Sequence, residues 1–295
     1  MNLQGKAQTY LLLMLTSAVW GFQPICIKWI VAEWTPVTLT TIRYICISAV
    51  LFGLLYRKNQ GHLLPPKECW PSLLLMGLNG VALNNVLQFT GLQYTTVTNC
   101  TLISATGPAI TALLAAIFVR ERLSLKAWLG IAISFVGVLA VVSEGSLELI
   151  RQIAFNFGDV LCFLSQIVWT IYSLLGLKVM DRMSALAVTA WAGLFGGIMT
   201  GLFGLGMGEL EFTMPGMLAW GSFIYTVFLG GVLSMLCWNL GVKRAGASIT
   251  AIFLNIMPVV GMIGGFFLLD ESIGTSQLAG ALAIFGGVYL TTHSG

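Results

Sequence analysis

The stretch PAITALLAAIFVRERLS, from Pro108 to Ser124, has a counterpart in PVVGMIGGFFLLDESIG, from Pro258 to Gly274. Each begins with a proline, continues as an apolar, helix-like run and carries a glutamate at the same place, Glu121 and Glu271. Arginines flank the first glutamate, whereas none stands near the second. The two stretches predict one structural unit that is used twice in different charge environments.

The surroundings of these stretches are too apolar for a soluble protein. Of the 295 residues, 57% are hydrophobic and 8% are charged, whereas soluble domains carry about 25% charged residues. Apolar runs of about 20 residues are long enough to cross a bilayer as helices, and alternating barrel strands are absent. The sequence predicts an all-α integral membrane protein with ten spans near residues 8–31, 36–56, 70–93, 98–119, 126–143, 158–179, 185–205, 216–241, 247–269 and 275–292.

The last five predicted spans repeat the first five. Trp20 matches Trp169 at an offset of 149, and after one insertion the offset becomes 150. The later pairs are Trp70 with Trp220, Gly80 with Gly230, Gly91 with Gly241, Pro108 with Pro258, Glu121 with Glu271 and Gly137 with Gly287. Because each copy has an odd number of spans, the second must enter the membrane from the opposite side. Residues 1–146 and 147–295 are therefore predicted to form two inverted five-helix repeats.

The distribution of basic residues predicts the orientation. Lys and Arg collect in cytoplasmic loops. With the N-terminus inside, eleven bases fall on the inner side and two, Lys28 and Arg151, on the outer side. The eleven are Lys6, Arg57, Lys58, Lys67, Arg120, Arg122, Lys126, Lys178, Arg182, Lys243 and Arg244. Both termini are therefore predicted to be cytoplasmic, which explains why only the first of the two repeated stretches carries bases.

Four segments resemble the EamA-type members of the drug/metabolite transporter superfamily. They are AVWGFQPICIKW, TTIRYICISAV, LNNVLQFTGLQYTTVTNCTLISATGPAITALLAAIFVRERLS and GALAIFGGVYL. The resemblance covers nearly the whole chain in both halves. It implies a ten-helix basket in a bacterial inner membrane, with a central cavity between the repeats. It also implies transport, often export, of amino acids and other small metabolites.

A polar stripe with one tryptophan recurs in the first and sixth spans. Trp20 and Gln23 share one helix face, and Trp169 and Tyr172 share the equivalent face. Both tryptophans lie about 12 residues into their spans, roughly mid-membrane at ~1.5 Å per residue. We expect them to line a cavity between the repeats, and the alternative is helix packing.

Amides and prolines mark four further spans. Side-chain amides donate and accept hydrogen bonds, which suits a zwitterionic or neutral polar ligand, or else interhelical contacts. Pro108 and Pro258 leave a carbonyl unpaired in their helices, which predicts a hinge in each, or a static bend. The amide residues are Asn84, Asn85, Gln88, Asn239 and Asn255, and Trp238 precedes Asn239. We expect all of these except Asn84 to contact the ligand.

Arg43 is the ionisable group that lies well inside a span, about seven residues past Pro36. An intramembrane charge is costly and marks a functional site by default. A substrate carboxylate or phosphate is its natural partner. The alternative is a structural arginine that bonds helix carbonyls.

The remaining features exclude other classes. An intramembrane enzyme needs a nucleophile with a base, an H-E-x-x-H helix or an acid pair within a span, and His62 and His293 both fall outside the spans. No metal, cofactor or nucleic-acid partner is predicted. No acid lies near mid-span, which argues against proton-coupled export of lipophilic cations. Gly193, Gly197 and Gly201 suit close helix packing, within a monomer or in a weak homodimer.

These observations predict a secondary transporter of small polar metabolites, most of all an amino acid exporter, that works by alternating access. Two alternatives stay open. One is an exporter of organic cations or drugs, which an aromatic cavity would hold by cation–π contacts. The other is a passive channel.

Overall fold

The computed structural model describes residues 3–58, 63–118, 124–148 and 155–292. Every regular element within these ranges is a helix, in agreement with the predicted all-α class. The first half contains α1 (Leu3–Val31), α2 (Pro36–Lys58), η1 (Lys67–Cys69), α3 (Trp70–Met76), η2 (Gly77–Leu83), α4 (Asn84–Tyr94), α5 (Val97–Ser104), α6 (Gly107–Phe118) and α7 (Leu125–Val142). The second contains α9 (Phe157–Met180), α10 (Ala185–Met207), α11 (Met217–Tyr225), η3 (Thr226–Leu233), α12 (Ser234–Ala245), α13 (Ala247–Ile252), η4 (Phe253–Asn255), α14 (Ile256–Leu269) and α15 (Thr275–Thr292).

Nine helical segments of the described ranges are long and apolar enough to cross a membrane. They coincide with the first nine predicted spans. The tenth prediction, residues 275–292, coincides with α15 (Thr275–Thr292), which is not among the nine. Its first turn, Thr275–Gln277, is polar and lowers its hydropathy. The multi-pass architecture is therefore confirmed, while the tenth span stays a prediction.

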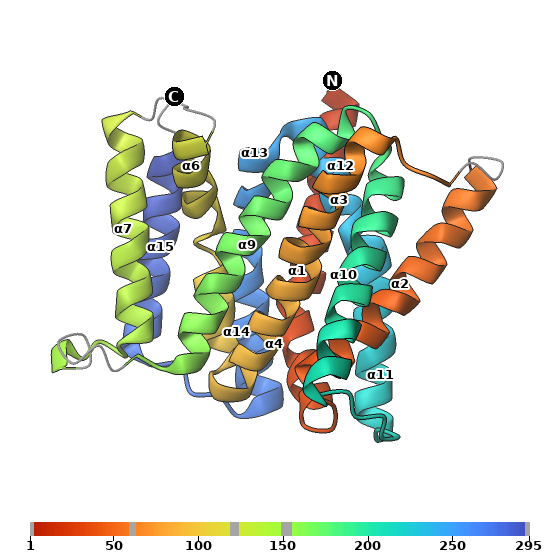
Figure 1. Ribbon diagram of the computed structural model, residues 1–295. Helices are drawn as coiled ribbons and strands as arrows, with labels where there is room; N and C mark the ends of the chain where they lie inside the picture. Colours follow the sequence, from red (N-terminus) through yellow and green to blue (C-terminus); the bar gives the residue numbers. More distant parts are fainter. Residues whose placement is uncertain (1–2, 59–62, 119–123, 149–154, 293–295) are drawn as a thin grey trace.

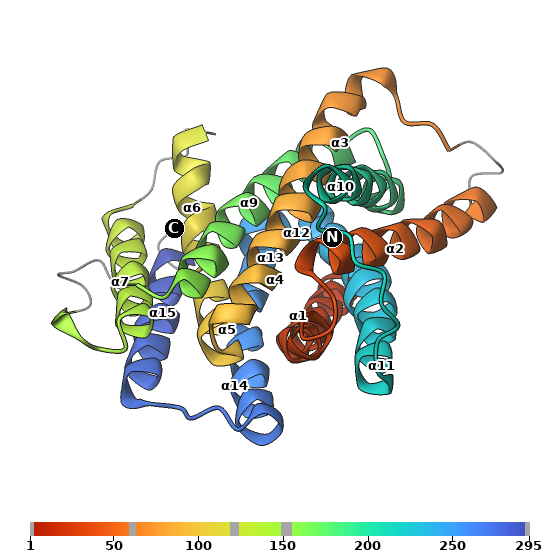
Figure 2. The ribbon, with the colours of Figure 1, turned by 60° about the horizontal axis from the view of Figure 1, so that its bottom comes forward.

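The helices form one bundle (Figure 1). Three pairs of equivalent spans lie side by side in it, α2 with α10, α5 with α14 and α7 with α15. Helices α7 and α15 form one edge, and α2 and α10 form the opposite edge, in both views (Figure 2). Helix α1 and helix α9 cross the middle, where α4 packs on α9 and α12 packs on α1. Helix α1 begins, and α15 ends, at the same end of the bundle (Figure 1).

Glycines set the spacing of the α7–α15 pair. A Cβ at Gly130 would lie 2.5 Å from the Gly287 carbonyl oxygen, and one at Gly137 would lie 2.8 Å from that of Gly280. Such small residues let membrane helices approach closely. Because Gly130 and Gly137 correspond to Gly280 and Gly287 at the offset of 150, the contact is reciprocal. Reciprocal contact of this kind is what a twofold relation between two copies produces.

The glycines Gly193, Gly197 and Gly201 of α10 pack against another helix of the same chain. Gly193 faces Ser48, and Gly201 faces Thr41, both on α2, while Gly197 faces Tyr44 between them. These three glycines therefore let α10 pack closely against α2.

Four spans are irregular, at equivalent places in the two halves. The π-helical segments η2 (Gly77–Leu83) and η3 (Thr226–Leu233) interrupt the third and eighth spans around Gly80 and Gly230. The fourth span is broken at Ala105–Thr106, before α6, and the ninth passes through η4 before α14. Pro108 and Pro258 each stand in the first turn after the break, where a missing N–H is tolerated. The structure places both prolines at the bends, and hinge motion there stays a proposal.

The orientation of the bundle is tested by labelling single cysteines in intact cells. We expect a membrane-impermeant maleimide to label Asp270→Cys and to spare Arg57→Cys, each in a cysteine-free background, because the basic residues collect inside. Both positions are exposed, so access to the reagent depends on the side of the membrane. Labelling of Arg57→Cys from outside would reverse the predicted topology.

Candidate functional site

A cavity of about 60 Å³ lies where the two halves meet, which leaves room for a few water molecules. Helices α1, α2, α4 and α5 contribute to it from the first half, and α9, η3, α12, η4 and α14 from the second. Its lining residues are Trp20, Gln23, Pro24, Arg43, Tyr44, Asn84, Asn85, Gln88, Ser104, Gln166, Trp169, Gly230, Met235, Leu254 and Met257. We name the space that these residues enclose the central cavity.

Arg43 gives the central cavity its positive charge. The side chain is 2% exposed, and all of its acceptors are neutral. Its Nη1 donates to Asn85 Oδ1 at 2.9 Å, its Nη2 to Gln23 Oε1 at 3.1 Å, and its Nε to the Thr226 carbonyl at 3.1 Å. Within the described part of the chain, Arg43 forms no ion pair. This buried cation has no counter-charge among the described residues, and an anionic ligand could supply one.

The π-helical segments supply carbonyls to this site. A π-turn shifts the hydrogen-bond ladder of a helix and is often found at functional sites. In η3, the Thr226 carbonyl accepts from Arg43, and the Gly230 carbonyl accepts from Trp20 Nε1 at 2.8 Å. In η2, the Val81 carbonyl accepts from Asn85 Nδ2 at 2.9 Å. The irregular backbone therefore orients three of the cavity's side chains.

Close packing at Gly230 has a counterpart in the other half. A Cβ at Gly230 would overlap Gln23 Oε1, and a Cβ at Gly80 would overlap the Tyr172 ring. Gln23 and Tyr172 stand at equivalent positions of the repeat, as Gly230 and Gly80 do. The two halves share this packing, but one presents an amide beside Arg43 and the other a phenol. The close contact between a glycine and a large side chain is repeated in the two halves, while the polarity of that side chain differs.

Tryptophans form one wall of the central cavity. The Trp20 and Trp169 rings meet edge to face, with centroids 5.4 Å apart. Trp238 packs behind both, at 5.3 and 5.5 Å, and Tyr172 stacks on Trp169 at 5.0 Å. Such pairs hold aromatic rings in defined orientations. The wall is a rigid aromatic surface with two rings facing the cavity and two supporting them.

Six of the ten predicted binding residues line the central cavity, namely Trp20, Gln23, Arg43, Asn85, Gln88 and Trp169. The other four do not belong to its lining. Tyr172 and Trp238 back the aromatic wall, and Asn239 donates from Nδ2 to Tyr172 Oη at 2.8 Å and to Thr189 Oγ1 at 2.7 Å. Asn255, in η4, has a buried Oδ1 without a partner among the described residues.

Sequence reasoning missed several lining residues. Gln166 precedes Trp169 by one helical turn, so the same face rule would have found it. Its Nε2 donates to Ser104 Oγ at 3.1 Å. Ser104 gives no signal in the sequence, because it lies at the end of α5, beside a break that only the folded chain shows. Tyr44 accepts from Asn85 Nδ2 at 3.3 Å and lies next to Arg43 in the chain.

A model of the EamA-like transporter family matches residues 7–143 and 156–293. The chain belongs to the EamA-like transporter family. This membership confirms the resemblance found in the sequence, and it makes the protein a multi-pass membrane transporter rather than an enzyme.

Named relatives agree with this membership. The chain is 34% identical over 220 residues to the uncharacterised transporter YyaM of Bacillus subtilis, covering 74% of this chain and 71% of the relative. It is 29% identical to an uncharacterised transporter of Archaeoglobus fulgidus, over 97% of this chain and 98% of that one. It is also 26% identical to an S-adenosylmethionine/S-adenosylhomocysteine transporter of Chlamydia trachomatis, over 88% and 82%.

One solved crystal structure has the same fold. The match has a TM-score of 0.71 and covers 97% of both chains at 16% sequence identity. At that identity the likeness concerns the fold alone. The arrangement of helices in this chain is thus also found in an independently determined structure.

Proposed function

We propose that this transporter carries small polar metabolites that bear a carboxylate, amino acids first among them, across a bacterial inner membrane by alternating access. Arg43 is the single observation that carries the proposal. It is a buried cation in the central cavity with no carboxylate partner among the described residues. A carboxylate ligand would accept from a guanidinium in the geometry that suits a planar fork.

The rest of the central cavity supports a zwitterion. Amide side chains of Asn84, Gln88 and Gln166 line it beside Arg43, and they can both donate and accept. Trp20 and Trp169 offer ring faces to an ammonium or an apolar group. The lining contains no acid, so a ligand with only positive charge would meet Arg43 without a compensating carboxylate.

The small volume of the central cavity and the helix breaks beside it support alternating access. A cavity of about 60 Å³ must widen to admit an amino acid. It lies between the halves, next to the breaks before Pro108 and Pro258, which rocking transporters use to open one side at a time. The outward direction follows from the resemblance to metabolite exporters.

Counterflow in proteoliposomes tests the proposal. Vesicles loaded with unlabelled amino acid should accumulate the labelled amino acid transiently and saturably, whereas the decarboxylated amine should not exchange. The panel includes neutral amino acids, their amines, a quaternary ammonium and S-adenosylmethionine, which also carries a carboxylate. Exchange of the quaternary ammonium but no amino acid would favour the organic-cation alternative. Flux that does not saturate would favour a channel.

A further inference from the structure

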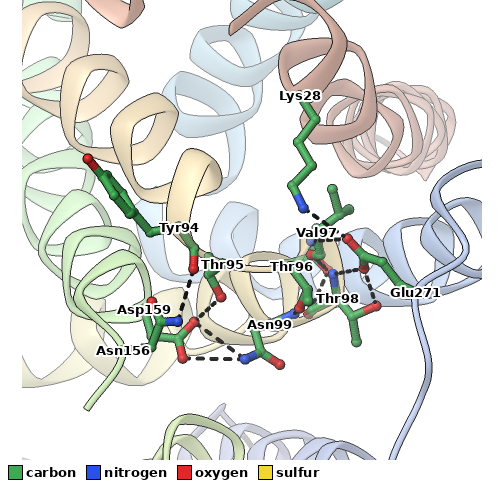
Figure 3. A network of polar contacts seen from close by, with 11 residues as sticks. Lys28, Tyr94, Thr95, Thr96, Val97, Thr98, Asn99, Asn156, Asp159 and Glu271 are labelled. Atoms are coloured by element: carbon green, nitrogen blue, oxygen red, sulfur yellow. Dashed lines mark hydrogen bonds and ion pairs between the residues drawn. The ribbon is translucent and has the colours of Figure 1, made fainter. Parts of the chain in front are cut away.

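Two carboxylates meet the beginning of α5 at the end of the bundle opposite the termini (Figure 3). Glu271, which follows α14, accepts from the backbone N–H groups of Val97 and Thr98 at 2.7 and 3.0 Å. It also accepts from Thr98 Oγ1 at 2.9 Å. Its side chain is buried against Gly265, where a Cβ would lie 2.7 Å from Glu271 Oε2. Glu271 therefore satisfies backbone donors that a helix start leaves open.

Asp159 binds the same helix start from the other side. It lies in the first turn of α9 and is 1% exposed. Thr95 Oγ1 donates to it through a short hydrogen bond, and Asn99 Nδ2 lies 3.3 Å from Asp159 Oδ2. Both carboxylates thus bond residues between Thr95 and Asn99, at the start of α5. The positive end of the α9 dipole also stabilises the negative charge of Asp159.

Lys28 connects this group to α1. Its Nζ lies 3.4 Å from Glu271 Oε1 (Figure 3), and its side chain is partly exposed. Segments from α1, α9 and the α14–α15 connection therefore converge on α5. We name Lys28, Asp159 and Glu271 the α5 clamp.

Helix α5 links the α5 clamp to the central cavity. It has eight residues, from Val97 to Ser104, which span about 12 Å at ~1.5 Å per residue. At its far end, Ser104 lines the central cavity and accepts from Gln166 Nε2. The break at Ala105–Thr106 separates α5 from α6. The backbone break therefore allows α5 to move relative to α6.

We propose that α5 is the gate on the side opposite the termini, and that the α5 clamp holds this gate closed. Two buried carboxylates, one of them paired with a partly exposed lysine, are an expensive means of static packing, which apolar residues provide at lower cost. Such directional polar contacts suit an interface that opens during transport and must close again in the same arrangement. The inference rests on alternating access, and Glu271 acts in it as a positioning residue.

The chain contains a reporter for the gate. Cys100 on α5 and Cys162 on α9 are both fully buried, with their sulfur atoms 2.9 Å apart. A thiol reagent reaches Cys100 only when α5 leaves α9. A disulfide between the two cysteines would bond α5 to α9 in the closed arrangement.

The first test measures how fast a small methanethiosulfonate modifies Cys100 in purified protein that keeps it as the only cysteine. Glu271→Gln should raise this rate about tenfold, which corresponds to about 1.4 kcal/mol. Asp270→Asn is the matched control, because it removes the neighbouring exposed carboxylate at φ 53°, a conformation that asparagine tolerates. It should leave the rate unchanged. A Glu271→Gln rate equal to that of the parent overturns the proposal.

A milder variant covers the case in which Glu271→Gln is not monodisperse. Thr98→Val removes one donor to Glu271 and keeps the side chain's shape. It should raise the modification rate about tenfold, because a hydrogen bond to a charged group contributes about 1.5 kcal/mol or more. No increase in a folded Thr98→Val protein would also overturn the proposal.

The second test locks the gate in a variant that keeps Cys100 and Cys162. Copper phenanthroline with oxygen serves as the oxidant, so the two thiols lose two electrons and two protons as the S–S bond forms. Transport should stop and return after dithiothreitol, while a Cys100-only variant stays insensitive. Continued transport in the cross-linked protein would contradict the gate. Failure of the reduced protein to transport would contradict the proposed function instead, and the modification rates would still decide on the gate.

Discussion

Replacing Arg43 by lysine should weaken the binding of amino acids by about 10- to 100-fold and leave the much weaker binding of their decarboxylated amines unchanged. Hydrogen bonds to charged groups contribute about 1.5–3 kcal/mol, which gives this range. Lysine keeps the charge but lacks the planar fork. Its ammonium cannot reach a carboxylate while also replacing the bonds to Gln23, Asn85 and the Thr226 carbonyl. Calorimetry on purified protein measures both ligands.

The control for this experiment lies on the same helix. Arg57 is exposed at the end of α2, so Arg57→Lys should bind both ligands like the parent protein. An equal loss of amine and amino acid affinity in Arg43→Lys would assign Arg43 to the architecture of the cavity, through Gln23 and Asn85. Unchanged amino acid binding would remove Arg43 from the site.

Truncating the aromatic wall should weaken binding for every ligand that reaches it. Trp169→Ala and Trp20→Ala each remove a ring that faces the central cavity. One good aromatic contact contributes about 0.5–2 kcal/mol, so we expect a two- to thirtyfold loss of affinity. Trp20→Phe separates two roles, because it keeps a ring but loses the bond to the Gly230 carbonyl. Affinity is measured by thermal shift across a ligand concentration series.

An exposed tryptophan provides the comparison for these variants. Trp128 on α7 is 47% exposed, and Trp128→Ala should leave affinity unchanged. Size-exclusion profiles establish that each variant is folded. If both cavity tryptophans can be replaced without loss of binding or transport, they are packing residues, and the proposed ligand site is wrong.

Six of the ten residues predicted from the sequence line the central cavity, because helical spacing is enough to place residues on one face. Trp20 with Gln23, and Asn85 with Gln88, share faces at i+3, and all four line the cavity. Tyr172 follows the same rule from Trp169, yet it lies behind the wall. Spacing gives a direction around one helix axis, and it does not say which neighbouring helix fills that direction.

Arg43 shows the same division. Its place inside a span was evident from the sequence, and the cost of a buried charge marked it as important. Its partners were not evident, because Asn85 and Gln23 lie 42 and 20 residues away and the third acceptor lies 183 residues away. That third acceptor, the carbonyl of Thr226, belongs to a π-helical segment that no residue pattern predicted.

The sequence by itself determined the membrane class, nine of the spans, the repeat with its offset of 149 to 150 and the family. These properties depend on hydrophobicity and on spacing along the chain, which local physics converts directly into helices in a lipid solvent. Only the tertiary structure decided which polar side chains meet. The central cavity, the π-turn carbonyls and the contacts of Glu271 with α5 depend on helix rotation and on breaks in the backbone. Small differences in packing decide the helix rotations and the positions of the breaks. Through them, residues more than a hundred positions apart in the sequence come close enough to form a hydrogen bond.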